Sequence, residues 1–135
     1  MPIVYRALRS LGCTISIWDG EIDERTARDH VLRLAQDSEW PPGPLHLTDL
    51  RTVRHATLPD AGLLDLLYEG TDLTEDIRVA VIVDPGQLSS PALHFMAGTI
   101  ELHALTFEDV ASACAYLDLD VGSVETVLAR LRHEL

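Results

Sequence analysis

The densest group of side chains that could bind a metal ion is acidic and lies near the N-terminus. Asp19, Glu21, Asp23 and Glu24 offer oxygen ligands of the kind that hard cations prefer. A calcium loop of the EF-hand type also needs a central glycine and a distant glutamate at fixed positions, and this segment lacks that order. We interpret the cluster as the solvated start of a helix and predict no metal site.

The other residue types that carry catalysis are scattered. No two of the six histidines have the His-x-x-x-His spacing that places two imidazoles on one turn of a helix. The sequence also lacks Gly-x-Ser-x-Gly and the glycine patterns that hold phosphate groups. We therefore predict no enzymatic activity and no cofactor. An enzymatic alternative would need a cleft with paired titratable groups.

Cysteine usage and charge narrow the class of protein further. Cys13 and Cys114 lie far apart within apolar runs, so we expect buried free thiols. Asp and Glu total 22 against 10 Lys and Arg, and the net charge of -12 argues against nucleic acid as a partner. Residues 1–6 lack the features of a signal peptide, and no apolar run is long enough to cross a membrane. These absences predict a cytoplasmic protein without a membrane partner.

The first half of the chain predicts a β-hairpin, a helix and a further strand. Residues 3–9 and 12–18 are rich in β-branched types, with a turn at Leu11-Gly12 that would place Cys13, Ile15 and Ile17 on one face. Residues 40–44, Trp-Pro-Pro-Gly-Pro, end the following helix, 44–49 read as a strand, and 51–58 read as a loop. The helix is predicted to follow Asp23 from apolar residues at the spacing of one face: Ala27, Val31, Leu34 and Ala35.

The second half continues with alternating helices and strands. A helix is expected from Pro59, a buried strand over 77–83, a third helix from Ser90-Pro91 to Gly98, and a last strand over 100–104. Thr106-x-x-Asp109 has the form of a capping box that opens a fourth helix. The predicted fold is an α/β domain over residues 1–135, with a mixed, mainly parallel sheet of about five strands and the element order ββαβαβαβαα.

A final helix over residues 123–135 adds an apolar stripe at the end of the chain. Two placements are open for the stripe, which consists of Val124, Val127, Leu128, Leu131 and Leu135. It either packs against the chain's own sheet or forms part of a homodimer contact.

The element order and one local motif resemble the STAS domain of bacterial anti-sigma factor antagonists, the SpoIIAA-like proteins. Residues 20–27, Gly-Glu-Ile-Asp-Glu-Arg-Thr-Ala, are similar to the family's Gly-Glu-Leu-Asp-x-x-Thr-Ala at the end of the second strand. Residues 107–117 also look like the last helix of an uncharacterised SpoIIAA-like group. The resemblance implies a STAS-like sheet and a role in binding a protein partner.

A second similar segment departs from the family at its most informative position. Residues 59–63, Pro-Asp-Ala-Gly-Leu, stand where the family typically has Asp-Ser-Ser-Gly-Leu, whose first serine is phosphorylated by the anti-sigma kinase. Asp60 would replace that serine with a fixed negative charge at the start of a helix, a position that favours anions. Thr57 is the nearest hydroxyl for phosphorylation, and its other reading is a helix cap.

The functional hypothesis is a non-catalytic regulatory module that binds a protein, implied by the resemblance to be an anti-sigma factor or a related kinase. The expected partner-binding surface consists of Asp23, Asp49, Thr57 and Asp60. The alternative is a carrier or sensor of a small apolar, lipid-like ligand, which would require an apolar cavity of roughly 300 to 1,000 Å³.

Overall fold

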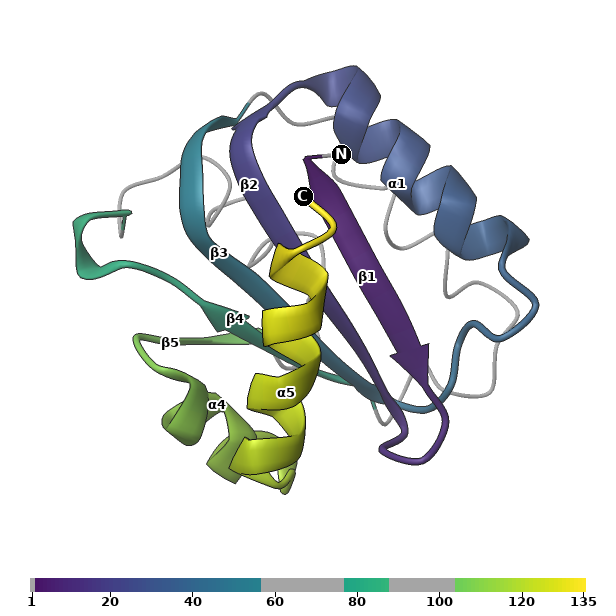
Figure 1. Cartoon of the computed structure of the whole chain (residues 1–135), viewed down its shortest axis with the longest axis vertical. Helices are drawn as coiled ribbons and strands as arrows, with labels where there is room; N and C mark the ends of the chain where they lie inside the picture. The colour runs from purple at the N-terminus through teal and green to yellow at the C-terminus, as the bar shows by residue number, and fades with distance from the viewer. Residues whose placement is uncertain (1, 57–76, 88–103) are drawn as a thin grey trace.

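The computed structural model describes residues 2–56, 77–87 and 104–135, which form a five-stranded mixed sheet with three α-helices (Figure 1). The strands lie side by side in the order in which they occur in the chain, and only β1 and β2 are antiparallel. They are β1 Ile3–Leu8, β2 Cys13–Ile22, β3 Leu45–Ala56, β4 Arg78–Ile82 and β5 Ala104–Phe107. The helices are α1 Glu24–Gln36, α4 Val110–Leu117 and α5 Val121–Arg132, with a 3-10 turn at Pro85–Gln87. The predicted α/β class and mainly parallel sheet are confirmed.

The order of the described elements differs from the predicted one. It reads ββαβββαα, with the 3-10 turn between β4 and β5, instead of ββαβαβαβαα. The helices predicted from Pro59 and from Ser90 fall within residues 57–76 and 88–103, which lie outside the described residues. The assignment of residues 1–135 to a single domain stays a prediction.

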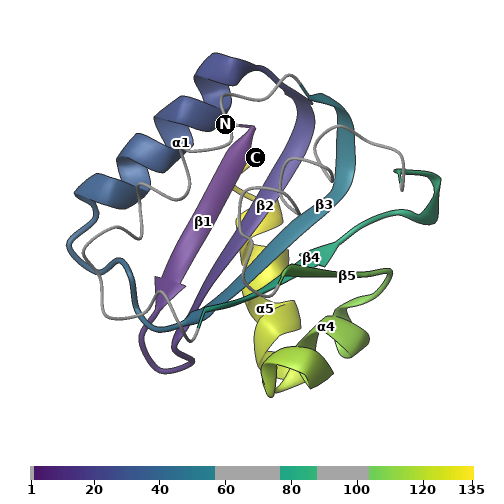
Figure 2. The same ribbon diagram turned by 180° about the vertical axis from the view of Figure 1, so that it is seen from behind.

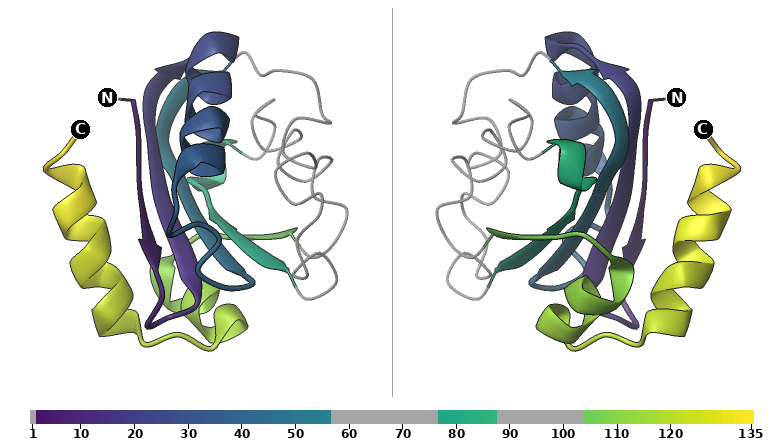
Figure 3. Two further views of the ribbon diagram at one scale, coloured as in Figure 1. Left: turned by 90° about the vertical axis from the view of Figure 1, so that its right-hand side faces the viewer. Right: turned by 90° about the vertical axis from the view of Figure 1, so that its left-hand side faces the viewer.

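Helices lie on both faces of the sheet. α1 runs alongside β1, the outermost strand (Figure 2), while α5 lies on the opposite face (Figure 3). Alternate residues of β1 to β4 pack with α4 and α5 into one apolar core. Its central members are Cys13, Ile15, Ile17, Leu47, Ala80, Ile82, Cys114, Leu117, Val124, Leu128 and Leu131. The predicted common face of the three β2 residues and the two buried thiols are thus confirmed.

The α1 helix begins where the sequence predicts it and ends before Trp40, as expected. Its buried residues include Ala27, Val31 and Leu34, but Ala35 is exposed. His30 takes the fourth buried position instead, because residues 27, 30, 31 and 34 form the stripe that faces the sheet.

The second and third strands are longer than predicted. β2 runs to Ile22, and β3 continues to Ala56 through residues that were expected to form a loop. The two extensions pair with each other, with register shifts after Ile17 and after Gly20. Backbone hydrogen bonds to the extended β2 stabilise the polar end of β3 as a strand. The side chains of this segment alone do not identify it as one.

The last strand includes Thr106, which the sequence predicts at the start of the fourth helix. β5 occupies 104–107, where Thr106 pairs with Val81 and does not cap a helix. Asp109 is the residue that caps α4, through a 2.6 Å hydrogen bond from the Ser112 backbone amide to its Oδ1. The predicted capping box was therefore wrong in its first residue, although the helix itself is present.

The C-terminal helix packs against its own sheet, the first of the two predicted placements. Val124, Leu128 and Leu131 are buried against β2 and its neighbours. The helix begins at Val121 and ends at Arg132, so its bounds differ from the predicted 123–135, and Leu135 follows it as an exposed residue. A homodimer contact stays a prediction.

Candidate functional site

The most strongly organised polar site surrounds Asp49 on β3. Leu47 lies in the core beneath α4 and α5, and Asp49, two residues further on, points to the same face. The Asp49 side chain is only 1% exposed. A carboxylate so deeply buried must have cationic or hydrogen-bonding partners to remain ionised.

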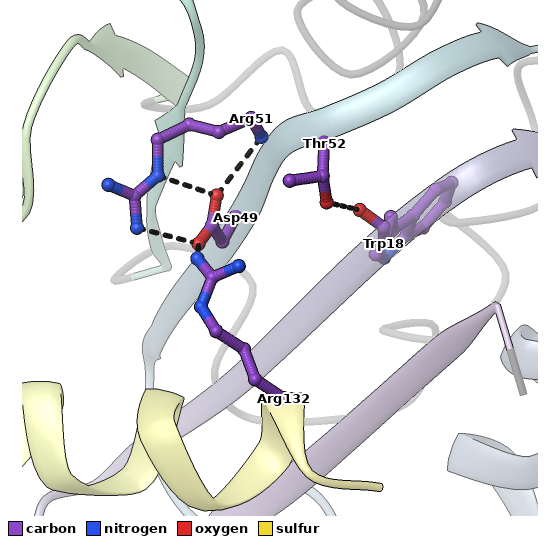
Figure 4. A network of polar contacts seen from close by, with 5 residues as sticks. All are labelled: Trp18, Asp49, Arg51, Thr52 and Arg132. Atoms are coloured by element: carbon purple, nitrogen blue, oxygen red, sulfur yellow. Dashed lines mark hydrogen bonds and ion pairs between the residues drawn. The ribbon is translucent and has the colours of Figure 1, made fainter. Parts of the chain in front are cut away.

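Two arginines from different elements supply those partners (Figure 4). Arg51, on the same face of β3, donates from Nε to Oδ1 at 3.0 Å and from Nη2 to Oδ2 at 2.8 Å. Its backbone amide also donates to Oδ1 at 3.0 Å. Arg132, in the last turn of α5, donates from Nη2 to Oδ2 at 2.6 Å. The carboxylate thus ties the end of α5 to the middle of β3.

The electrostatics of this network favour a structural role for Asp49, which is to hold α5 on β3. The hydrogen bonds to Asp49 raise the pKa of Arg51, and the nearby Glu125 acts in the same direction. The arginine side chains remain 33% and 39% exposed, so water contacts the cationic side of the network while the carboxylate is shielded. Sequence reasoning selected Asp49 but missed both arginines. Arg51 fell in a predicted loop, and Arg132 lies 83 residues away in the chain.

Asp23 has a separate local role at the start of α1. Its Oδ1 accepts a 2.7 Å hydrogen bond from the Thr26 amide. Hydrogen bonding to the Thr26 side chain, and then to its backbone amide, lowers the pKa of the exposed carboxyl group. Asp23 follows Ile22, which pairs with Ala56, seven residues along β3 from Asp49. At about 3.3 Å per residue, seven residues place Ala56 roughly 23 Å from Asp49 along the strand.

The predicted partner-binding surface is therefore described only in part. Asp23 is exposed at the far end of β2, whereas Asp49 is buried beneath α5. Thr57 and Asp60 lie outside the described residues. The structure does not bring the two described members together, and the four-residue surface stays a prediction.

A second polar group, missed by sequence reasoning, lies on the α1 side of the sheet. His30 is 2% exposed and makes edge-on ring contacts with Tyr5 at 5.6 Å and with Trp18 at 5.7 Å. Burial lowers the pKa of His30 to about 3, with smaller contributions from His46 and Arg33. The imidazole is therefore neutral at physiological pH. The signal in the sequence was the position of His30 between Ala27 and Val31 on the buried stripe.

Hydrogen bonding within this group is incomplete among the described residues. Trp18 Nε1 and His30 Nδ1 are buried and have no hydrogen-bond partner there. On the same side of the sheet, His46 is also buried, and desolvation lowers its pKa to about 4. His103 lies outside the described residues.

The remaining chemistry of the described segments is limited. They contain no cluster of three or more acidic, histidine or cysteine side chains that could hold a metal ion. Burial raises the pKa of the Cys13 thiol to about 12, so it stays protonated. Two clefts of about 320 and 520 Å³ flank α1, and Arg33 lines both. The smaller is also lined by Asp37 and Glu39, and the larger by Asp29 and Leu32. The carrier alternative stays a prediction.

The fold and the site define an α/β protein with a mixed five-stranded sheet, in which a buried carboxylate joins β3 to α5. No helix among the described residues is long and apolar enough to cross a membrane. Comparison with protein-family models and with curated proteins gives no match for this chain.

Proposed function

We propose that this chain is a non-catalytic regulatory module that binds a protein partner in the manner of anti-sigma factor antagonists. The observation that supports this proposal best is the arrangement of the N-terminal half. An antiparallel β1–β2 pair leads through the segment 20–27 into α1, and parallel strands follow in chain order. The segment that resembles the STAS motif thus stands at a strand-to-helix junction, capped by Asp23, as the resemblance implies.

The charge of the chain supports a partner with a basic surface. Acidic residues outnumber basic ones by 22 to 10, and complementary charge would accelerate the encounter with such a partner. The proposed partner is an anti-sigma factor or a related kinase, and the proposed location is the cytoplasm. Asp60 would supply a single permanent negative charge to this surface, where the resemblance implies a switchable one.

The test is a binding titration with purified anti-sigma factors from the source cell. We expect the native chain to bind one of them, Asp60→Lys to weaken binding at least about tenfold, and Asp60→Ser to bind with little change. Glu108→Lys makes the same charge change at an exposed residue before α4 and serves as the matched control. Failure of every purified partner to bind, or equal affinity of the Asp60→Lys and native chains, would overturn the proposal.

Phosphorylation gives an independent measurement. With the anti-sigma kinase and ATP, we expect no label on residue 60 of the native chain and label on the Asp60→Ser chain. Any label on the native chain should disappear in Thr57→Ala, because Thr57 is the neighbouring hydroxyl. A native chain labelled at another residue would contradict this assignment of the switch.

A further inference from the structure

The outer edge of β1 presents backbone groups that no other strand of the described sheet uses. Among residues 2–56, 77–87 and 104–135, β1 has a neighbouring strand on one side only. The Asp19 amide donates to the Pro2 carbonyl at 2.8 Å, which sets the even-numbered residues of β1 toward β2. The backbone N–H and C=O groups of Ile3, Tyr5 and Ala7 consequently point away from the sheet.

Two arginine side chains lie over this edge. Arg33 Nη2 donates to the Ile3 carbonyl at 3.4 Å, and Arg6 Nη1 donates to the Tyr5 carbonyl at 2.9 Å. Both contacts are with carbonyl groups that a neighbouring strand would otherwise use. Charged side chains in this position protect an exposed strand edge from uncontrolled pairing, and they can move aside because each is long and flexible.

A cleft of about 320 Å³ runs along the same edge. Its floor is formed by residues 3–7, and its sides are formed by the C-terminal part of α1 and by Glu134 near the C-terminus. Figure 2 shows α1 beside β1 along this edge. Because five consecutive residues of this edge strand line the cleft, an extended chain bound there would run along the strand.

We propose that the β1 edge and this cleft bind an extended, basic peptide segment of a partner protein, which adds to the sheet as a sixth strand. Backbone hydrogen bonds to the outward-facing groups would supply much of the affinity. Three acids line the cleft against two arginines, Arg6 and Arg33, and the whole chain carries a charge of -12. The acids are Asp37, Glu39 and Glu134.

A second copy of this chain fits the edge less well than a peptide does. Pairing of two β1 strands about a twofold axis would bring two α1 helices to the same face, because α1 packs beside the outermost strand. An isolated peptide strand carries no such helix. This second surface is separate from the described part of the one proposed for the anti-sigma partner, since neither Asp23 nor Asp49 lines the cleft.

The test uses two short synthetic peptides, one alternating valine with arginine and one alternating valine with glutamate. Fluorescence anisotropy should show the arginine peptide binding at least about tenfold more tightly. Hydrogen exchange should show slower exchange of the Tyr5 and Ala7 amides in the complex. Equal affinity for the two peptides, or no binding of either, would overturn the proposal.

Two matched variants locate the binding site. Ala7→Pro removes an outward N–H that β2 does not use, a position where an edge strand tolerates proline. We expect it to lose about tenfold in affinity, while Ala7→Val keeps the N–H and binds normally. Glu39→Lys, outside the sheet, tests the charge requirement even if Ala7→Pro does not fold. A native dimer that becomes monomeric in Ala7→Pro would instead assign the edge to a second copy and overturn the peptide proposal.

Discussion

Replacement of His30 by phenylalanine should make the stability of this protein less sensitive to acid. The imidazole is 2% exposed and lies between the rings of Tyr5 and Trp18. Phenylalanine keeps an aromatic ring of similar size in this position but cannot bind a proton. The variant therefore separates the titration of residue 30 from its packing.

The sign of the effect follows from the lowered pKa. His30 has a pKa of about 3 in the folded chain, against an ordinary value of 6.5. Between these two pH values the unfolded chain binds a proton that the folded chain does not, so the free energy of unfolding falls as the pH falls. The free energy of unfolding that neutral His30 contributes is fully present above pH 6.5, and it is lost progressively as the pH falls to about 3.

The magnitude follows from the same two pKa values. A single group of this kind lowers the free energy of unfolding by about 1.4 kcal/mol for each unit that the pH falls, once the pH is well below 6.5. Between pH 7 and pH 5 the loss is about 2 kcal/mol. His46, with its pKa lowered to about 4, should contribute a similar loss. The native chain should thus lose about 4 kcal/mol over this interval and His30→Phe about 2 kcal/mol.

Urea unfolding monitored by tryptophan fluorescence at about pH 7, 6 and 5 measures these differences. Carboxyl groups with ordinary or lowered pKa values titrate mostly below this interval, so the histidines dominate it. His133→Gln is the matched control for the removal of a histidine, because His133 is exposed at the end of α5. The reasoning fails if His30→Phe and the native chain lose the same free energy between pH 7 and pH 5.

Three further substitutions test the local structure by urea unfolding. Asp49→Asn should cost about 2 kcal/mol, because it removes the charge that both arginines bind, and the cost should shrink little in high salt since the carboxylate is buried. Gly43→Ala should cost about 1–3 kcal/mol, because the new Cβ would lie 2.5 Å from the Gly12 carbonyl oxygen. Asp23→Ala should lower the urea midpoint through loss of the hydrogen bond from the Thr26 amide, whereas Asp23→Ser should lower it less. Unchanged midpoints in any of these variants would contradict the corresponding contact.

The elements that the sequence predicted well are those in which one local signal suffices. Asp23 and the apolar spacing after it define the start and the buried face of α1. The run from 77 to 83 is apolar on both faces except for Arg78, and the strand β4 lies within it, buried except at Arg78. In both cases the side chains of neighbouring residues carry the information, so no knowledge of distant contacts is needed.

The elements that the sequence predicted poorly depend on a partner strand. Residues 51–56 are polar and read as a loop, yet they form the end of β3 because the extended β2 pairs with them. Thr106 has the sequence context of a helix cap, yet it pairs with Val81 in β5. Backbone hydrogen bonds to a neighbouring strand overrode the local preference in each case.

Asp49 shows why a candidate site residue is harder to predict than a helix. In the sequence it is a polar residue at the end of a short strand, which suggests exposure and a role in binding. In the structure β3 continues past it, α5 covers it, and its charge is balanced by an arginine on each of these elements. Since the carboxylate is only 1% exposed, a partner could reach it only by displacing Arg132 and the end of α5. Asp23, which is exposed just before α1, is therefore better placed to meet a basic partner than Asp49, whose charge already serves to hold the C-terminal helix on the sheet.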